Sequence, residues 1–496
     1  MPKDLILALD QGTTSSRALL FDIRGQLLGS AQQALTQIYP HPGWVEEDPL
    51  EILSSQLATL TGVLVASHVS PERVAAIGIS NQRETTILWN RQTGLPIANA
   101  IVWQCRRTAE MVEQIAGDPA VAHRITATTG LIPDAYFSAS KIAWLLEQIP
   151  GARQAAERGE LAFGTVDSWL VYALTGGRVH ATDFTNASRT MLFDIQRRQW
   201  DPWLLQLFNI PESILPEVRP SASDFGLTSH PSIPGGLPIY GVAGDQQAAL
   251  FGQRCYQSGA AKDTLGTGAF LLMHTGEKLC VSKHRLISTL AASAPDQTAA
   301  EYALEGSIFV AGALVQWLRD ELGLLRSAAA SERLAQQVTD NAGVYVVPAF
   351  TGLGAPWWDA EARGAILGLT RGARREHVVR AALEAIAYQS ADLIQAFESD
   401  SGLAINQLKV DGGVAGNGFL MQFLADLLNI PIERPKSQES SGLGAAFLAG
   451  LQAGLWQNQA ELLSLDLAYR RWSPRPLDRD KLLTGWHQAL ARVRSN

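Results

Sequence analysis

The chain is poor in the residues that build disulfide frameworks and metal sites. Only three of its 496 residues are cysteines (Cys105, Cys255 and Cys280), and their spacing fits neither a disulfide framework nor a zinc site. The nine histidines contain no HxxxH pair or similar cluster, so we expect no transition metal ligated by the protein. This cysteine usage is typical of a reducing compartment, and we expect a cytoplasmic protein.

A basic charge balance and long apolar runs are also missing. The 40 basic and 48 acidic residues give a net charge of −8, which argues against nucleic acid and anionic membranes as partners. The apolar run Leu5–Leu9 is too short for the core of a signal peptide, and no stretch approaches a membrane span. Since 496 residues suffice for two or three domains, we expect a globular protein with more than one core.

Two common nucleotide-binding motifs are absent as well. There is no GxxxxGK[ST] and no GxGxxG after a predicted strand, so neither a P-loop nor a dinucleotide-binding fold is indicated. The chain has instead the segment Leu5–Asp22, in which two apolar strands flank a turn of hydroxyl residues and Gly12. The N–H and hydroxyl groups of this turn can bind phosphate oxygens, and Asp10 at its edge can interact with a hydrated Mg²⁺. The same turn is equally compatible with a plain hairpin that faces water.

A second copy of this pattern favours the phosphate-binding interpretation. The segment Lys262–Thr275 contains the turn Gly266-Thr267-Gly268, which leads into another apolar strand. Two such hairpins, one near the start and one past the middle, indicate a duplicated architecture. This arrangement resembles the actin-like (ribonuclease H-like) ATPase fold, in which two related α/β domains hold a nucleotide in the cleft between them.

Polar residues follow two predicted strands of the first half. The strand Val74–Ile79 runs into Asn81–Thr86, which includes Arg83 and Glu84, and a second apolar pair precedes Trp103. Polar strand ends are where open α/β sheets carry their sites, and an arginine beside a glutamate offers donors and acceptors to a polyhydroxyl ligand. The alternatives are an exposed ion pair without consequence and a tryptophan that belongs to the core.

A third strand end carries Asp245. The apolar strand before it closes on Gly244, and an alanine-rich helix begins directly afterwards. Asp245 can therefore be a helix N-cap, which is the commoner role at such a junction. A carboxylate at a strand end facing a cleft is also what a kinase needs as the base for an attacking hydroxyl.

At this point the chain resembles a known family. The stretches ALDQGTTSSRA, SNQRETT and WQCRRT look like those of the glycerol kinases, within the FGGY carbohydrate kinases, and the similarity extends to about Trp456. Tyr136–Trp144 and Gly364–Glu384 fit two patterns that run through the wider family. The resemblance implies phosphorylation of glycerol by ATP to sn-glycerol 3-phosphate, with Mg²⁺, in a homodimer or homotetramer.

The resemblance also implies roles for individual residues. Asp245 would be the catalytic base, and Asp10 would help to place Mg²⁺. Glycerol would be bound by Arg83, Glu84, Trp103, Tyr136, Asp245, Gln246 and Phe270. ATP would be bound by Thr13, Thr14, Ser15, Arg17, Gly266, Thr267, Gly312, Gln316, Gly413 and Asn417.

Two other functions remain open from the sequence. The chain could phosphorylate another polyol or sugar, such as a pentulose or gluconate, although Arg83, Glu84 and Trp103 favour a small pocket. It could also be a nucleotide-driven scaffold of the actin or chaperone type, in which Asn81–Thr86 and Asp245 would have no evident role. We expect an N-terminal domain over 1–253 that carries the glycerol site and a C-terminal domain over 254–496 that carries most of the nucleotide site.

The hydrophobic pattern predicts the remaining main elements. Helices are expected over Pro49–Val65, Ile308–Leu318, Glu376–Phe397, from Phe419, and over Ser440–Gly450, the last composed of small residues for close packing. Strands are expected over Tyr345–Phe350 and Leu408–Val410. The loop Thr182–Met191 is interpreted as mainly structural.

Overall fold

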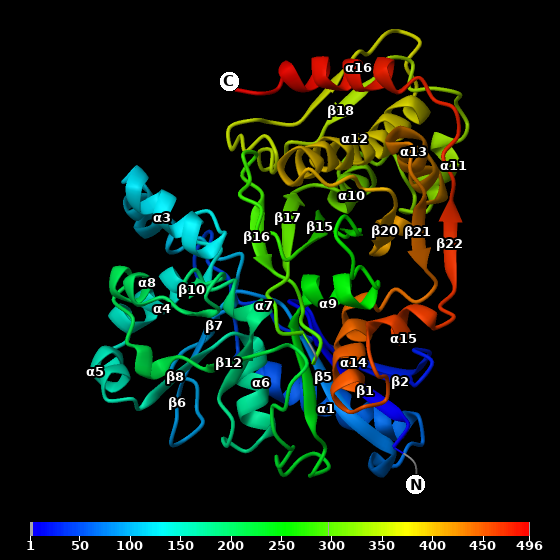
Figure 1. Ribbon diagram of the computed structural model, residues 1–496. Coiled ribbons are helices and arrows are strands. Elements are labelled where there is room, and N and C mark those ends of the chain that lie inside the picture. The colour runs from blue at the N-terminus through cyan, green and yellow to red at the C-terminus, as the bar shows by residue number, and fades with distance from the viewer. Residues whose placement is uncertain (1–2, 296, 496) are drawn as a thin grey trace.

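The computed structural model describes residues 3–295 and 297–495 and contains two sheets of the same design (Figure 1). The central pair of the first sheet is an antiparallel hairpin, which a third antiparallel strand extends on one side and two parallel strands extend on the other. In spatial order its strands are β13 (Ile239–Gly244), β5 (Val74–Asn81), β1 (Leu5–Gln11), β2 (Ser15–Asp22) and β3 (Leu27–Ala34).

The second sheet repeats this order and adds a strand at each edge. Its central hairpin again has an antiparallel strand on one side and parallel strands on the other, which confirms the predicted duplication. In spatial order its strands are β16 (Ile287–Leu290), β17 (Tyr302–Ile308), β15 (Ala269–Gly276), β14 (Ala261–Leu265), β20 (Leu408–Asp411), β21 (Ile432–Pro435) and β22 (Tyr469–Trp472).

Strand β1 is apolar on both faces because helices cover both sides of the first sheet. Leu5, Leu7 and Leu9 are buried in one cluster with residues of α1 (Pro49–Ala66). Ile6 and Ala8, which point to the other face, are buried against α14 (Ser440–Gln452). Side chains alternate between the two faces of a strand, so an unbroken apolar run is what a sheet covered on both faces requires.

Helix α14 belongs to the second half of the chain but lies on the first sheet. In Figure 1 it lies beside β1 and β2, and it contacts β1, β5, β13 and α9 (Asp245–Gly252). Its small residues permit this approach, since a Cβ on Gly444 would lie 1.8 Å from the carbonyl oxygen of Ala248. The predicted close-packing role of this helix is confirmed.

Helix α1 has the length and composition of a membrane span, although no such span is predicted from the sequence. Among the described residues it is the one helix that does, with 18 residues and a mean hydropathy of 1.3. Half of it is buried in the fold, where Ile52, Leu60 and Val63 have no exposed surface. Asp48 caps its N-terminus by accepting a hydrogen bond from the N–H of Leu50. The helix is therefore a core element of the first domain.

A second layer of helices and short strands extends the first domain and forms a core of its own. Its strands are β4 (Glu46–Glu47), β6 (Ile87–Asn90), β7 (Ala100–Ile101), β8 (Leu161–Gly164), β9 (Ala181–Asp183), β10 (Phe193–Asp194), β11 (Gln199–Trp200) and β12 (Glu217–Arg219). Its helices are α2 (Ala109–Ala116), α3 (Pro119–Thr129), α4 (Ser138–Gln148), α5 (Ala152–Glu157), α7 (Phe184–Ala187) and α8 (Pro202–Leu207). Helix α6 (Val166–Leu174) and Ala181 of β9 are buried instead in the core of the first sheet, together with residues of α1.

The remaining elements complete the second domain and the C-terminal part of the chain. They are α10 (Gly312–Asp320), α11 (Ala330–Ala335), β18 (Tyr345–Val347), β19 (Ala365–Leu367), α12 (Arg375–Ser401), α13 (Gly418–Leu428), α15 (Gln459–Ser464) and α16 (Arg479–Ala491). Two predicted bounds were wrong. Ile308 ends a strand and the helix after it starts only at Gly312, while the strand from Tyr345 stops at Val347.

Candidate active site

The polar segment that follows β5 lies at the centre of the candidate site. All six residues of Asn81–Thr86 are buried, so Arg83 and Glu84 are not an exposed ion pair. Glu84 has a φ of 60°, which is unusual for a residue other than glycine and often marks a functional turn. This sharp turn directs neighbouring side chains toward different partners.

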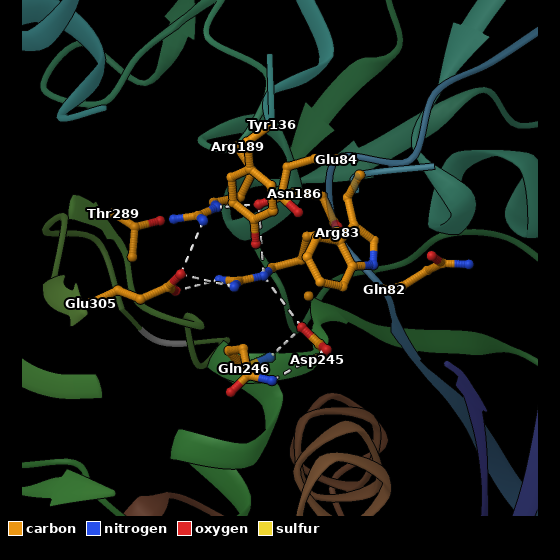
Figure 2. Close-up of polar contacts among 12 residues, drawn as sticks. Gln82, Arg83, Glu84, Tyr136, Asn186, Arg189, Asp245, Gln246, Thr289 and Glu305 are labelled. Atoms are coloured by element: carbon orange, nitrogen blue, oxygen red, sulfur yellow. Dashed lines mark hydrogen bonds and ion pairs between the residues drawn. The ribbon is translucent and has the colours of Figure 1, made fainter. Parts of the chain in front are cut away.

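Arg83 and Glu84 belong to a charged cluster that also contains Arg189 and Glu305 (Figure 2). Glu305 accepts hydrogen bonds from Arg83 Nη1 and Nη2 at 2.5 and 3.0 Å, and from Arg189 Nη2 at 3.0 Å. Arg189 Nε donates to Glu84 Oε1 at 2.6 Å. Two arginines and two glutamates therefore neutralise one another in a buried environment, the condition under which buried charges are tolerated.

Asp245 lies next to this cluster and differs from its acids in exposure. It begins α9, and its carboxylate accepts hydrogen bonds from the backbone N–H and the side-chain amide of Gln246 at 2.7 and 3.3 Å. Arg83 Nε lies 3.3 Å from Asp245 Oδ1. The Asp245 side chain is 33% exposed, against 1–2% for Glu84 and Glu305. Asp245 is therefore the most exposed of these three carboxylates.

Aromatic rings border the same region. The rings of Trp103 and Tyr136 meet edge to face with centroids 5.5 Å apart, and both are only partly buried. Trp103 Nε1 donates a hydrogen bond to Thr13 Oγ1 at 3.0 Å, which joins the predicted polyol site to the first hairpin. Burial raises the pKa of the Tyr136 hydroxyl, so this group stays protonated.

The second domain contributes Lys262 and Phe270. Lys262 Nζ donates to Gln246 Oε1 at 2.5 Å and to Thr264 Oγ1 at 2.8 Å, and it also approaches the carbonyl oxygen of Phe270. Burial lowers the pKa of Lys262, whereas neighbouring acids, Asp245 among them, oppose that shift. Gln246 is thus held from both domains.

The first hairpin brings Asp10 and Arg17 to the cleft. Gly12 closes the turn by donating its N–H to the carbonyl oxygen of Ser15 at 3.0 Å, while Thr14 is exposed. Burial raises the pKa of Asp10 to about 6; Arg17 opposes the rise, and the carboxylates of Asp245 and Glu439 add to it. Arg17 Nη1 pairs with Glu439 Oε2 at 2.9 Å, so its charge is shared with an acid at the start of α14.

The second hairpin adjoins the start of α10. The N–H of Gly312 donates to the carbonyl oxygen of Gly266 at 2.9 Å, and a Cβ on Gly312 would lie 2.5 Å from that oxygen. Thr267 is exposed, and its carbonyl oxygen accepts from two N–H groups of the same helix start. Its side chain is therefore accessible to a ligand, whereas its carbonyl oxygen is already hydrogen-bonded.

The other predicted nucleotide residues lie around this hairpin. A Cβ on Gly412 would lie 2.5 Å from the carbonyl oxygen of Leu265, so the turn after β20 abuts the hairpin. Gly413 and Gln316 are exposed. The amide of Asn417 caps α13 by accepting from the N–H of Leu420 and also donates to Ser331 Oγ, so both ends of this side chain have structural partners.

Two members of the charged cluster were missed by sequence reasoning. Arg189 lies in Thr182–Met191, which the sequence predicts to be a mainly structural loop; the segment instead contains the end of β9 and all of α7, and it reaches the site. Glu305 is the single charged residue of the strand Tyr302–Ile308, and a lone acid in an apolar strand is the signal that could have identified it. Within the described residues, no group of three histidine, cysteine or acidic side chains could hold a metal ion.

Comparison with known proteins agrees with this geometry. Residues 5–252 match the N-terminal domain model of the FGGY family of carbohydrate kinases, and residues 261–453 match the C-terminal domain model. A protein of Clostridium beijerinckii named glycerol kinase is 54% identical over 494 residues, which cover 99% of each chain.

Solved structures give the same result. The glycerol kinase of Plasmodium falciparum with ADP superposes with a TM-score of 0.93 at 37% identity, covering 99% of this chain and 98% of that one. The gluconate kinase of Lactobacillus acidophilus has a TM-score of 0.88 at 22% identity over 99% and 98% of the two chains, a likeness that shows the fold alone. With two actin-like α/β domains and both family models matched, the chain belongs to the FGGY family of carbohydrate kinases.

Proposed function

We infer that this chain transfers the γ-phosphoryl group of ATP to glycerol, giving sn-glycerol 3-phosphate and ADP. The observation that carries this inference is the 54% identity to a glycerol kinase over 99% of both chains. At the same coverage, the gluconate kinase is only 22% identical. No observation favours a different sugar or a scaffold function.

The site supports a base-assisted transfer. In phosphoryl transfer, catalysis consists mainly of positioning and of stabilising charge. Asp245 would accept the proton of the attacking hydroxyl, because its carboxylate is one-third exposed and is oriented by Gln246 and Arg83. Glu84 and Glu305 are poorer candidates, since both are almost fully buried and arginines already bind Glu84 Oε1 and both oxygens of Glu305.

The glycerol pocket would lie between Asp245 and the two aromatic rings. Arg83, Glu84, Asp245 and Gln246 would bind the hydroxyls, with Tyr136 completing the polar wall. Trp103 and Phe270 would contact the carbon atoms, and the edge-to-face packing of Trp103 on Tyr136 would form one side of the pocket. Removal of the buried partner of a polar substrate typically costs about 1–3 kcal/mol, which gives such a pocket its selectivity.

ATP would lie between the two hairpins. Thr13, Thr14, Ser15 and Arg17 from the first hairpin and Gly266 and Thr267 from the second would bind the phosphates, with Gly312, Gln316, Gly413 and Asn417 around the rest of the nucleotide. Asn417 has the weakest support, because both ends of its amide are already hydrogen-bonded.

Asp10 would help to hold Mg²⁺. Asp10 is a partly buried carboxylate whose pKa is raised to about 6, and the acids Asp245 and Glu439 contribute to that rise, so a divalent cation would stabilise its charged form. Mg²⁺ commonly binds through one or two carboxylates, waters and substrate phosphates, which suits a site with few protein ligands. When bound, the ion would offset the negative charge of the transferred phosphoryl group.

We also propose a division into domains over 1–253 and 254–496, with α14 and α15 returning to the first domain. A cytoplasmic location and a homodimeric or homotetrameric assembly are proposed from the family resemblance. Closure of the two domains around both substrates would exclude water and limit ATP hydrolysis.

One assay tests the substrate assignment. Release of ADP from ATP is measured with glycerol, ribulose, xylulose and gluconate in parallel, each at a range of concentrations. We expect glycerol to give the highest kcat/KM. A higher value for one of the sugars would identify a different kinase of the family, and no turnover with any of them would contradict the enzymatic assignment.

A further inference from the structure

Glu305 reaches from the second domain into the polyol site of the first. It lies on β17, a strand of the second sheet, whereas Arg83, Glu84 and Arg189 belong to the first domain. Its side chain is 2% exposed, and in Figure 2 its carboxylate is joined by hydrogen bonds to both guanidinium groups. Because this charged side chain contacts residues of the other domain at the proposed glycerol site, packing alone does not account for it.

Both arginines donate hydrogen bonds to this one carboxylate. Each terminal nitrogen of Arg83 donates to a Glu305 oxygen, and the remaining contact of these nitrogens is with Gln247 Oε1 at 3.0 Å. Arg189 has its Nη2 on Glu305 and its Nε on Glu84, while its Nη1 is buried without a hydrogen-bond partner. Loss of Glu305 would leave Arg189 with a single acceptor.

The terminal nitrogens of Arg83 face Glu305, and its Nε faces the acids Asp245 and Glu84. Its Nε lies 3.3 Å from Asp245 Oδ1 and 3.9 Å from Glu84 Oε1, the two acids that the proposed function assigns to glycerol. A bidentate arginine–carboxylate pair fixes both the plane and the direction of the guanidinium. The geometry around the substrate hydroxyls is therefore set by a residue that need not touch them.

Glu305 is charged in this setting. Burial by itself would raise the pKa of its carboxyl, but Arg189 and Arg83 more than offset that effect and bring the pKa to about 2. At neutral pH, Glu305 thus neutralises part of the charge of two arginines packed in one place. Without it, the two guanidinium groups would repel each other across the pocket.

We propose that Glu305 is a positioning residue for the polyol site, which holds Arg83 and Arg189 in place and couples glycerol binding to the docking of the second domain. This inference rests on the proposed function. A purely structural contact between the domains would stabilise the fold without discriminating between the two substrates, and that difference can be measured.

The test compares Glu305→Gln with Glu305→Asp and a matched control, Glu384→Gln. Glu384 is also a buried acid of the second domain bonded to an arginine, Arg380 at 2.8 Å, but it does not contact the charged cluster. For each variant, kcat and the KM values for glycerol and for ATP are measured, together with the melting temperature.

We expect Glu305→Gln to raise the KM for glycerol at least tenfold while the KM for ATP changes less than threefold. Glu305→Asp, which keeps the charge on a shorter side chain, should give an intermediate KM for glycerol and remains informative if the glutamine variant does not fold. Glu384→Gln should lower the melting temperature and leave the KM for glycerol within threefold of the wild type.

Three results would overturn the inference while leaving glycerol phosphorylation intact. They are an unchanged KM for glycerol in Glu305→Gln, an equal rise in both KM values, and a rise in the KM for glycerol in Glu384→Gln that matches the one in Glu305→Gln. Failure of the wild-type protein to phosphorylate glycerol would instead contradict the proposed function itself.

Discussion

At the scale of single residues, Asp245 differs from the neighbouring acids Glu84 and Glu305 in the exposure and the contacts of its carboxylate. Guanidinium groups bind one oxygen of Glu84 and both oxygens of Glu305, and both side chains are almost fully buried, whereas Asp245 is one-third exposed and is oriented by the amide groups of Gln246. A base must be able to approach the hydroxyl it deprotonates, so exposure and orientation together favour Asp245.

Replacing Asp245 with asparagine tests this role. Asparagine keeps the shape of the side chain but cannot accept the proton, and loss of a general base typically lowers the rate by about 10²–10⁴. We expect kcat to fall by that order while the affinity for ADP, measured by calorimetry, changes less than threefold. A variant that retained more than half of the wild-type kcat would exclude Asp245 as the base.

Asp10 gives a prediction about pH. Its pKa is raised to about 6, above its ordinary value of 3.8, so the carboxylate that would face Mg²⁺ gains a proton as the pH falls through about 6. Because a metal ligand must be deprotonated, the affinity for ADP with Mg²⁺ should then fall by about tenfold per pH unit below that value.

The nucleotide also titrates in this range, so Asp10→Asn serves as the control. Calorimetric titrations of both proteins with ADP and Mg²⁺ between pH 5 and 8 separate the two effects. The amide introduced by this substitution does not titrate, and the variant should show only the pH dependence of the nucleotide. Identical pH profiles for the two proteins would remove Asp10 from the metal site.

The residue scale is also where the sequence was least informative. Arg83, Glu84 and Asp245 could be identified because each follows a strand end, where sites of open sheets lie. Arg189 and Glu305 come from a loop and from a strand of the other domain, and no local pattern says that a lone acid will meet two distant arginines. Only the assembled fold brings them within hydrogen-bond distance.

At the scale of elements, the two hairpins and the helix α14 were the clearest predictions. Apolar strands around a glycine turn specify a hairpin locally, and the small residues of Ser440–Gly450 indicate close helix packing. The start of α10 was predicted too early, because the apolar residues Ile308 and Val310 continue the helical pattern although the chain is still leaving β17.

The close packing of α14 predicts the effect of Gly444→Ala. The new Cβ would lie 1.8 Å from the carbonyl oxygen of Ala248, and backbone cannot move aside as a flexible side chain can. Overpacking of this kind typically costs about 1–3 kcal/mol, or more where the backbone must shift. At roughly 2–4 °C per kcal/mol for a domain of this size, we expect the melting temperature to fall by several degrees.

Gly62→Ala is the matched control for this substitution. Gly62 lies inside α1 on the same sheet, and its Cβ would meet only the Cβ of Ala31 at 3.6 Å, an ordinary contact. Alanine favours the helix over glycine by up to about 1 kcal/mol, so this variant should be as stable as the wild type or more so. If Gly444→Ala had the same melting temperature as Gly62→Ala, the packing of α14 against Ala248 would not be as close as the structure indicates.

At the scale of the whole molecule, the duplication of the sheets could be predicted from the sequence. The packing of α14, from the second half of the chain, on the first sheet could not. Two similar hairpins in the sequence indicate two similar sheets. By contrast, the apolar pattern of 440–452 says only that the helix is buried and does not name the sheet that buries it. The structure places it on the first sheet, on the far side of the proposed domain boundary from its neighbours in sequence.

Because α14 completes the core of the first sheet, we expect that residues 1–253 do not form a stable unit alone. Ile6, Ala8 and Phe251 belong to a core whose other half comes from α14 and the segment up to Leu462. Without that half, an apolar face of the first sheet would be exposed, and exposed faces of this kind lead to aggregation. We expect the fragment to be aggregated or to lack a cooperative thermal transition.

A fused fragment provides the decisive comparison. A Cβ on Gly252 would lie 2.2 Å from the carbonyl oxygen of Ser440, so the end of the first segment and the start of α14 adjoin in space. In the fused protein, a short glycine-serine linker joins residue 253 directly to the segment 438–466, which contains α14 and α15. The missing helices are therefore restored without the second domain. The fused protein should be soluble and melt cooperatively in calorimetry. If instead residues 1–253 fold alone, or if the fusion fails to rescue them, α14 is not the element that completes the first domain.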